Sequence, residues 1–175
     1  MCSSDLAGID LSVFALKSDN TLWAWGDNTG GKLGLGNVVS RSSPVQITGA
    51  WNKVASSGSN GFGIKTDGSL WGWGLGTNGG VGDNTAINRS SPVQIGALTT
   101  WTDVGGGSTQ IGQAIKSDGT LWQWGDWQST GIGPAVNVSS PVQVGTNAAS
   151  SSTTTFTGFG HISGTVSRAA PVYKS

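Results

Sequence analysis

Glutamate is absent from this sequence, and all nine acidic residues are aspartates. Only 10% of the residues are charged, and the nine Lys and Arg residues bring the formal net charge to +0. Helices favour Glu, Leu, Ala and Lys, whereas this chain is rich in Gly, Ser, Thr, Val and Trp, a composition typical of all-β proteins. The basic residues are scattered singly, so we expect no nucleic-acid partner and no attraction to an anionic membrane.

Cysteine and long apolar runs are also scarce. The single cysteine, Cys2, excludes an internal disulfide, and no apolar run approaches the ~20 residues that a membrane helix needs. The segment Cys2 to Leu6 matches the translation of a common sequencing adapter, which favours a metagenomic fragment that lacks its upstream part; a genuine start is the open alternative. The low charge and the Ser/Thr/Gly/Asn-rich loops are compatible with an extracellular, cell-surface or virion-associated protein.

What is present is a repeat. The pattern Asp-x-x-Leu-Trp-x-Trp-Gly begins at residues 19, 67 and 118, and Ser-Pro-Val-Gln begins at residues 43, 91 and 140. A period near fifty residues indicates a repeat architecture. We predict units at residues 1–50 (N-terminally incomplete, since it lacks the leading Trp), 51–100 and 101–149, with a degenerate or incomplete fourth unit at 150–175.

Each unit has room for four strands, placed in the second unit at residues 51–55, 61–66, 69–74 and 92–95. Asp67-Gly68 supplies the positive φ of a tight hairpin, and Pro92 confines the last strand to a sheet edge. Period two puts Trp71 and Trp73 on one face of the third strand, opposite Leu70 and Gly72. The sequence therefore predicts an all-β partial β-propeller of about three four-stranded blades plus an incomplete fourth, in which stacking between blades stabilises the fold.

The residues from Lys17 to Asn28, followed by Gly31-Lys32-Leu33-Gly34 and the Ser-Pro-Val-Gln segment, resemble the bacterial or phage form of the regulator of chromosome condensation (RCC1) repeat. The resemblance covers about residues 7–147 and implies an arc of a typically seven-bladed ring. In the third unit Thr130 replaces the usual loop Gly, and Trp127 the usual Asn. The founding member of that family is a nucleotide-exchange factor for a small GTPase, a plant relative senses UV-B, and a bacterial relative inhibits β-lactamases.

Few residues suggest chemistry of their own. Trp127 departs from the repeat just after a strand and is the candidate for stacking on a ligand, with incidental loop packing as the alternative. The Gly-rich loops lack the helix that phosphate-binding motifs need, the Asp spacing does not fit a Ca²⁺ loop, and His161 with Cys2 cannot form a zinc site. We therefore expect no catalytic residues, no cofactor and no metal.

These observations favour a non-enzymatic binding or structural module that presents loops to a protein or glycan partner. A regulatory propeller acting on a small GTPase is the alternative, and a hydrolase that depends on His161 is a third. Function is expected where the copies differ, as between residues 75–78 and 126–129. The open faces of the end blades should require further repeats or self-association to cover them, so we expect this chain alone to dimerise, aggregate or be marginally stable.

Overall fold

The structure is a computed structural model that describes residues 12–107, 110–126 and 136–145, together with the backbone of residues 5–9, 154–159 and 162–166. Its described part is built from antiparallel strands and two short 3₁₀ turns. Among the residues described, no helix has the length and apolar character to span a bilayer.

Three four-stranded sheets follow one another along the chain, and we call them blades 1, 2 and 3. Their strands pair in sequence order. Blade 1 comprises β1 (Asp5–Ile9), β2 (Ser12–Leu16), β3 (Leu22–Gly26) and β4 (Arg41–Ile47). Blade 2 comprises β5 (Trp51–Ser56), β6 (Asn60–Lys65), β7 (Leu70–Gly74) and β8 (Arg89–Gln94). Blade 3 comprises β9 (Trp101–Gly106), β10 (Ile111–Lys116), β11 (Leu121–Gly125) and β12 (Val138–Gln143).

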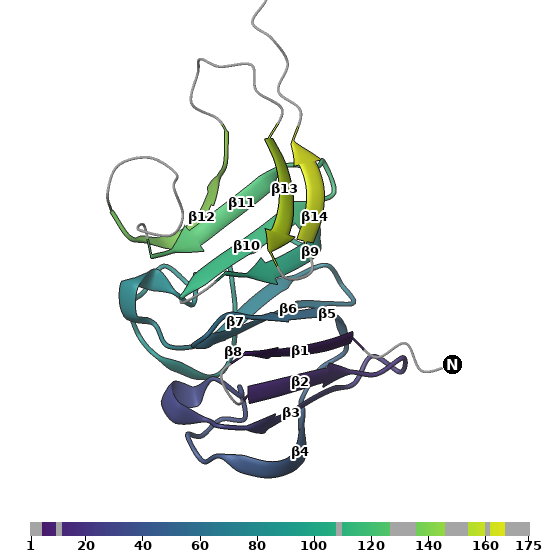
Figure 1. Ribbon diagram of the computed structural model, residues 1–175, viewed down its shortest axis with the longest axis vertical. Coiled ribbons are helices and arrows are strands. Elements are labelled where there is room, and N and C mark those ends of the chain that lie inside the picture. Colours follow the sequence, from purple (N-terminus) through teal and green to yellow (C-terminus); the bar gives the residue numbers. More distant parts are fainter. Residues whose placement is uncertain are drawn as a thin grey trace, which may run out of the picture.

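The remaining elements are short. The 3₁₀ turns η1 (Thr29–Gly31) and η2 (Thr77–Gly79) lie between the third and fourth strands of blades 1 and 2. Strands β13 (Thr154–Phe159) and β14 (Ile162–Val166) form a separate two-stranded sheet. The blades stack along the long axis of the molecule (Figure 1). The turns η1 and η2 lie at one side, and the hairpins that join the second and third strands of each blade lie at the other.

The fourth strands lie at the sheet edges, as proline predicts, but β8 begins at Arg89, three residues before Pro92. The expected start at residue 92 was therefore too late. Trp71 pairs with Gln94 and Gly72 with Val93, and the register then shifts before Gly74 meets Arg89. The bulge accommodates Pro92 because an edge strand can interrupt its ladder where proline has no N–H to donate.

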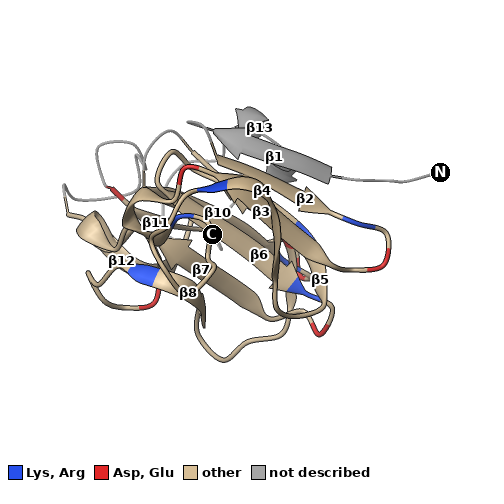
Figure 2. Cartoon of the chain, turned by 90° about the horizontal axis from the view of Figure 1, so that it is seen from below, with Lys and Arg blue, Asp and Glu red and all other residues tan. Residues whose placement is uncertain are grey.

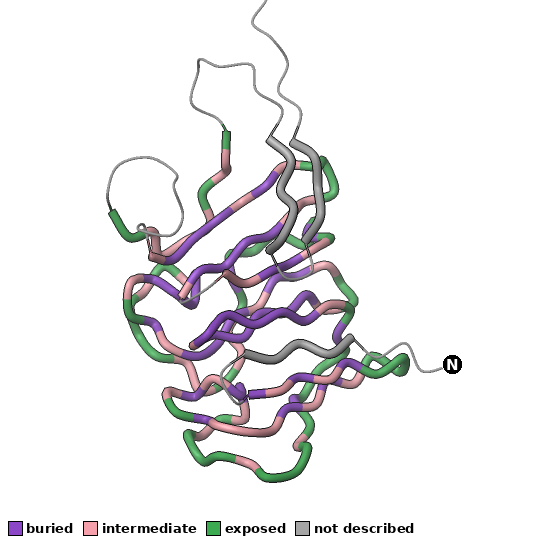
Figure 3. Tube along the Cα trace, in the orientation of Figure 1, coloured by how far each residue is buried: buried purple, intermediate pink, exposed green. Residues whose placement is uncertain are grey.

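The core lies between the blades rather than within one sheet. The Trp-bearing face of blade 2, with Trp51 and Trp73 fully buried, packs against the face of blade 1 that carries Phe14 and Leu22. The Phe14 and Trp73 rings meet edge to face at 5.8 Å between centroids. Phe62 and Trp124 repeat this contact between blades 2 and 3 at 5.3 Å. The prediction that Trp71 and Trp73 share one face is thus confirmed. Figure 3 shows the buried residues concentrated in the strands of the stacked blades.

The innermost strands approach one another closely. A Cβ atom added to Gly106 on β9 would lie 2.2 Å from the carbonyl oxygen of Ser56 on β5. Only glycine permits this contact, because any other residue would place a Cβ against the neighbouring strand. The hairpins also match their prediction: Gly68 and Gly119 have φ of 80° and 79°, and Asn20 takes the same place in blade 1 at 64°.

Candidate functional site

The repeated aspartate anchors a tryptophan as well as a turn. In blade 2 the Asp67 carboxylate accepts hydrogen bonds from the backbone amide and hydroxyl of Ser69, and the Ser69 hydroxyl accepts one from the Trp71 indole at 2.8 Å. The same relay recurs in the other two blades through Asp19, Thr21 and Trp23, and through Asp118, Thr120 and Trp122. The three aspartates therefore have a structural role, in which they fix the hairpin turn and the tryptophan side chain.

These contacts change the acidity of the carboxyl groups. Hydrogen bonds from the Thr21 hydroxyl, the Thr21 amide and Lys17 lower the pKa of Asp19 from 3.8 to about 2. The Ser69 hydroxyl lowers the pKa of Asp67, and the Thr120 hydroxyl lowers that of Asp118. The Lys32 ammonium, with the Thr29 hydroxyl, holds the pKa of Asp27 well below its usual range.

We expect the chain to lose stability as the pH falls from about 4 towards 2. Lowered carboxyl pKa values in the folded state mean that the unfolded chain takes up protons first, so this stabilisation is complete above the unfolded pKa of about 4 and disappears below the folded values. Thermal melting between pH 7 and pH 2 measures the effect. Asp118→Asn keeps a side-chain oxygen that can accept the hydrogen bonds of the turn, and it should reduce the fall in melting temperature at acid pH. Equal melting temperatures of the natural chain at pH 7 and pH 2.5 would contradict the prediction.

A lysine covers the outer tryptophan of blades 2 and 3. The ammonium nitrogen of Lys65 lies 3.5 Å from the centroid of Trp71 and 5.3 Å from that of Trp51. Lys116 repeats this arrangement at 3.6 Å from Trp122 and 5.0 Å from Trp101. Each ammonium is thus held over aromatic faces by its attraction to the ring quadrupoles. No carboxylate lies within salt-bridge distance of either lysine among the described residues.

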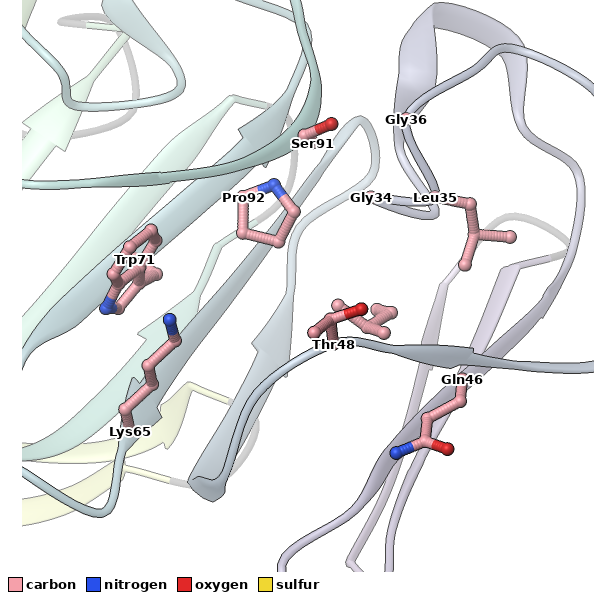
Figure 4. A pocket seen from close by; sticks show the side chains of 10 residues that line it. Gly34, Leu35, Gly36, Gln46, Thr48, Lys65, Trp71, Ser91 and Pro92 are labelled. Atoms are coloured by element: carbon pink, nitrogen blue, oxygen red, sulfur yellow. The ribbon is translucent and has the colours of Figure 1, made fainter.

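A groove of about 310 Å³ lies between the outer edges of blades 1 and 2 (Figure 4). Lys65 and Trp71 form one wall, and Leu35 and Gln46 line the opposite one. Pro92 and Ser91 from β8 and Thr48, just after β4, lie between them. The groove therefore combines an aromatic side chain, a cation and several exposed polar side chains from two blades.

The loops between the third and fourth strands form a second surface, the long-loop rim. In blade 1 the buried Asn28 amide organises this loop: its nitrogen donates to the carbonyl oxygens of Asn37 (2.9 Å) and Val39 (3.1 Å), and its oxygen accepts from the Leu33 amide at 2.9 Å. In blade 2 the equivalent position is Gly76, whose backbone amide instead donates to the Asn88 side chain at 2.9 Å.

Ion pairs fix the rim differently in the two blades. Lys32 and Asp27 lie 2.7 Å apart in blade 1, and Arg89 and Asp83 2.6 Å apart in blade 2. The Asp83 side chain is only 3% exposed. Burial raises the pKa of Asp83, but hydrogen bonds from Thr85 and Arg89 outweigh it, so that the pKa is lowered overall.

Each rim loop also holds the next blade. The Gly36 amide donates to the carbonyl oxygen of Ser90 at 2.7 Å, and the Asn84 amide donates to that of Ser139 at the same distance. Residues 75–78, which we expected to carry function because the copies differ there, take part in this contact: Asn78 accepts a hydrogen bond from the Asn137 side chain at 2.9 Å. This part of the loop therefore joins blades.

Three aliphatic side chains at equivalent positions stay exposed on the rim. Val39, Ile87 and Val136 are 56%, 58% and 58% exposed, and we call them the aliphatic row. Each stands five residues before the proline of its Ser-Pro-Val-Gln segment. Sequence reasoning missed the row, although alignment of the copies on these prolines would have found it.

The other candidate residues fall partly outside the structure's description. Trp127, His161, Cys2 and residues 128–129 lie outside the described residues. Within the described ranges no group of three or more His, Cys, Asp or Glu residues could hold a metal ion. The carboxylates of the rim, Asp27 and Asp83, are both paired with cations, and Figure 2 shows the charged residues dispersed over loops and strand ends.

Comparison with known proteins agrees with this architecture. Residues 19–61 and 67–111, together about half of the chain, match the family model of the regulator of chromosome condensation (RCC1) repeat. No curated protein sequence matches the chain.

Solved structures give the same fold. Prp20p from Saccharomyces cerevisiae matches with a TM-score of 0.71 and 21% sequence identity, covering 80% of this chain and 37% of Prp20p. Human WBSCR16 matches with a TM-score of 0.65 and 20% identity, covering 77% of this chain and 37% of that one. The chain thus spans little more than a third of the length of these structures. The likeness confirms the predicted all-β partial propeller, and at this level of identity it shows the fold alone.

Proposed function

The chain belongs to the regulator of chromosome condensation (RCC1) repeat family, and we propose that it is a non-enzymatic scaffold whose long-loop rim binds a partner protein. The aliphatic row carries this proposal. Val39, Ile87 and Val136 are exposed and contribute nothing to the core, yet a β-branched residue occupies this position in three successive blades. Exposed apolar residues that gather on one surface mark protein interfaces, whereas single ones need no explanation.

The chemistry of the row suits a protein better than a sugar. Val39, Ile87 and Val136 carry neither an aromatic ring for stacking nor a polar atom for hydroxyl groups. Covering three half-exposed aliphatic side chains is worth roughly 3 kcal/mol, since full burial of one contributes about 1.5–3 kcal/mol. That contribution is large enough to dominate a modest interface.

The backbone beneath the row is already fixed. The Val39 carbonyl oxygen accepts from Asn28, and the Val39 amide donates to the Asn37 side chain at 3.0 Å. The Ile87 amide donates to the Thr85 hydroxyl at 3.3 Å. Because these bonds order the loops of blades 1 and 2 before a partner arrives, little conformational entropy of those two loops would be lost on binding.

A variant with Val39→Ser, Ile87→Ser and Val136→Ser tests the proposal. We expect it to keep the melting temperature of the natural chain, because exposed substitutions change stability by about 0.5 kcal/mol or less. When each variant is cross-linked to its partners in the source cells, the triple variant should recover at least tenfold less partner protein than the natural chain. This corresponds to a loss of about 1.4 kcal/mol in binding free energy. Leu98→Ser, another exposed apolar position away from the row, is the control. Equal recovery with the triple variant would overturn the proposal.

A further inference from the structure

We propose that the groove between blades 1 and 2 binds a carboxylate-bearing sugar, such as a uronic acid unit of a polysaccharide. The groove is separate from the aliphatic row and shares no residue with it. The proposal is therefore independent of the partner protein proposed for the rim. It is carried by three features of the groove: its cation, its polar side chains and its size.

The cation comes first. Lys65 lines the groove, and its ammonium is positioned over Trp71 at 3.5 Å from the ring centroid. No described carboxylate neutralises it within salt-bridge distance. Asp67, close to Lys65 in the sequence, directs one oxygen to the Ser69 amide and hydroxyl. Asp67 is thus near enough to interact with the Lys65 charge but forms no ion pair with it, so the ammonium can donate charge-assisted hydrogen bonds to an incoming carboxylate.

The polar side chains favour a sugar over a simple anion. Gln46, Thr48 and Ser91 line the groove from two blades, and none has a side-chain hydrogen bond to another described residue. They can therefore exchange hydrogen bonds with hydroxyl groups. Trp71, Pro92 and Leu35 supply the apolar surface against which the C–H groups of a sugar ring can pack (Figure 4). A volume of about 310 Å³ is at the small end of ligand sites, which suits one sugar unit rather than a large ligand.

The corresponding residues of blades 2 and 3 differ from this lining at three positions. Lys116, Trp122 and Pro141 repeat Lys65, Trp71 and Pro92 in the register of the repeats. Asp83, Asn84 and Gly96, however, stand where the groove has Leu35, Gly36 and Thr48. The Asp83 carboxylate is paired with Arg89, so the change at this position removes apolar surface, and the loss of the Thr48 hydroxyl removes a polar contact. We therefore assign the acidic sugar to the groove between blades 1 and 2 only.

Titration with trigalacturonate, followed by the indole N–H resonances in ¹H–¹⁵N spectra, tests the assignment. We expect saturable binding that shifts the Trp71 resonance more than that of Trp122. Lys65→Met keeps the aliphatic stem over Trp71 and should weaken binding at least tenfold, since it removes a charge-assisted contact. The matched variant Lys116→Met, which removes an ammonium held over Trp122 in the same geometry, should change affinity less than twofold.

Neutral trigalactose and free acetate complete the experiment. Trigalactose binding as tightly as trigalacturonate would overturn the role of charge, and acetate binding as tightly would overturn the role of the sugar. Absence of saturable binding, or an equal effect of Lys65→Met and Lys116→Met, would overturn the site itself. The aliphatic-row variant should bind trigalacturonate unchanged, so failure of the groove and failure of the protein-binding rim can be told apart.

Discussion

Replacing Gly68 by alanine should lower the free energy of unfolding by about 3 kcal/mol or more, whereas Gly119→Ala should cost only about 1–2 kcal/mol. The two glycines occupy the same hairpin position in blades 2 and 3, with φ of 80° and 79°. Both variants therefore place a Cβ in the same left-handed conformation, and that strain is common to them.

The difference lies in what the added methyl group meets. At Gly68 it would lie 2.2 Å from the carbonyl oxygen of Thr99, while at Gly119 nothing described lies within 4 Å. The Gly68 carbonyl also accepts a hydrogen bond from the Trp101 amide, where the next blade begins. Gly68→Ala thus forces the hairpin of blade 2 away from blade 3.

Urea denaturation of the two variants and the natural chain measures this difference. A larger loss for Gly68→Ala shows that the hairpin tip is a joint between blades. Equal losses would mean that left-handed strain accounts for the whole effect and that the contact with Thr99 relaxes without cost. The m-values should stay constant, because both variants should expose the same surface on unfolding.

The local parts of the fold could be predicted because short spacings determine them. Asp67-Gly68 specifies a hairpin, the alternation from Leu70 to Gly74 separates two faces, and Pro92 marks an edge strand. None of these depends on residues far away in the chain. The start of β8 was misplaced because the ladder continues beyond the proline, which only the pairing of Gly74 with Arg89 reveals.

The surfaces could not be predicted because they depend on contacts between blades. Lys65 looks like any exposed strand-end lysine in the sequence, yet it lies over two tryptophans that come from β5 and β7. Leu35 and Pro92 are distant in sequence and line one groove only because blade 1 stacks on blade 2. The exposure of Val39 and Ile87 is likewise a property of the folded rim loops.

One face of blade 3 departs from the pattern of the other two blades. In the register of the strands, Gln113 on β10 takes the place of Phe14 and Phe62. Gln123 on β11 takes that of Ala24 and Gly72. Both glutamines are only 5% exposed. They lie on the face that, in blades 1 and 2, receives the tryptophans of the next blade. This face of blade 3 therefore presents amide groups instead of an aromatic ring, and a Trp-bearing face packed on it would leave polar groups unpaired.

At the opposite end of the arc lies the tryptophan-bearing face of blade 1. A pair of tryptophan variants should separate the role of this end face from that of a face buried between blades. Trp73→Ala should destabilise the chain by about 3–5 kcal/mol, the usual cost of removing a large buried aromatic side chain. Trp73 is fully buried, contacts Phe14 and Trp51, and donates its indole N–H to the Lys32 carbonyl oxygen at 3.0 Å. Chemical denaturation measures the loss.

Trp25 is the matched position in blade 1, but it is only half-buried, because no Phe-bearing blade face is described beside it. Trp25→Ala should therefore cost about 1 kcal/mol within a single chain, in proportion to the smaller area that it buries. If two copies cover this face between them, as the open end of the arc leads us to expect, Trp25→Ala will also lower the molar mass in light scattering at high concentration. Trp73→Ala and Trp25→Ala with equal effects on unfolding would contradict the view that stacking of successive blades, rather than the single sheet, stabilises this fold.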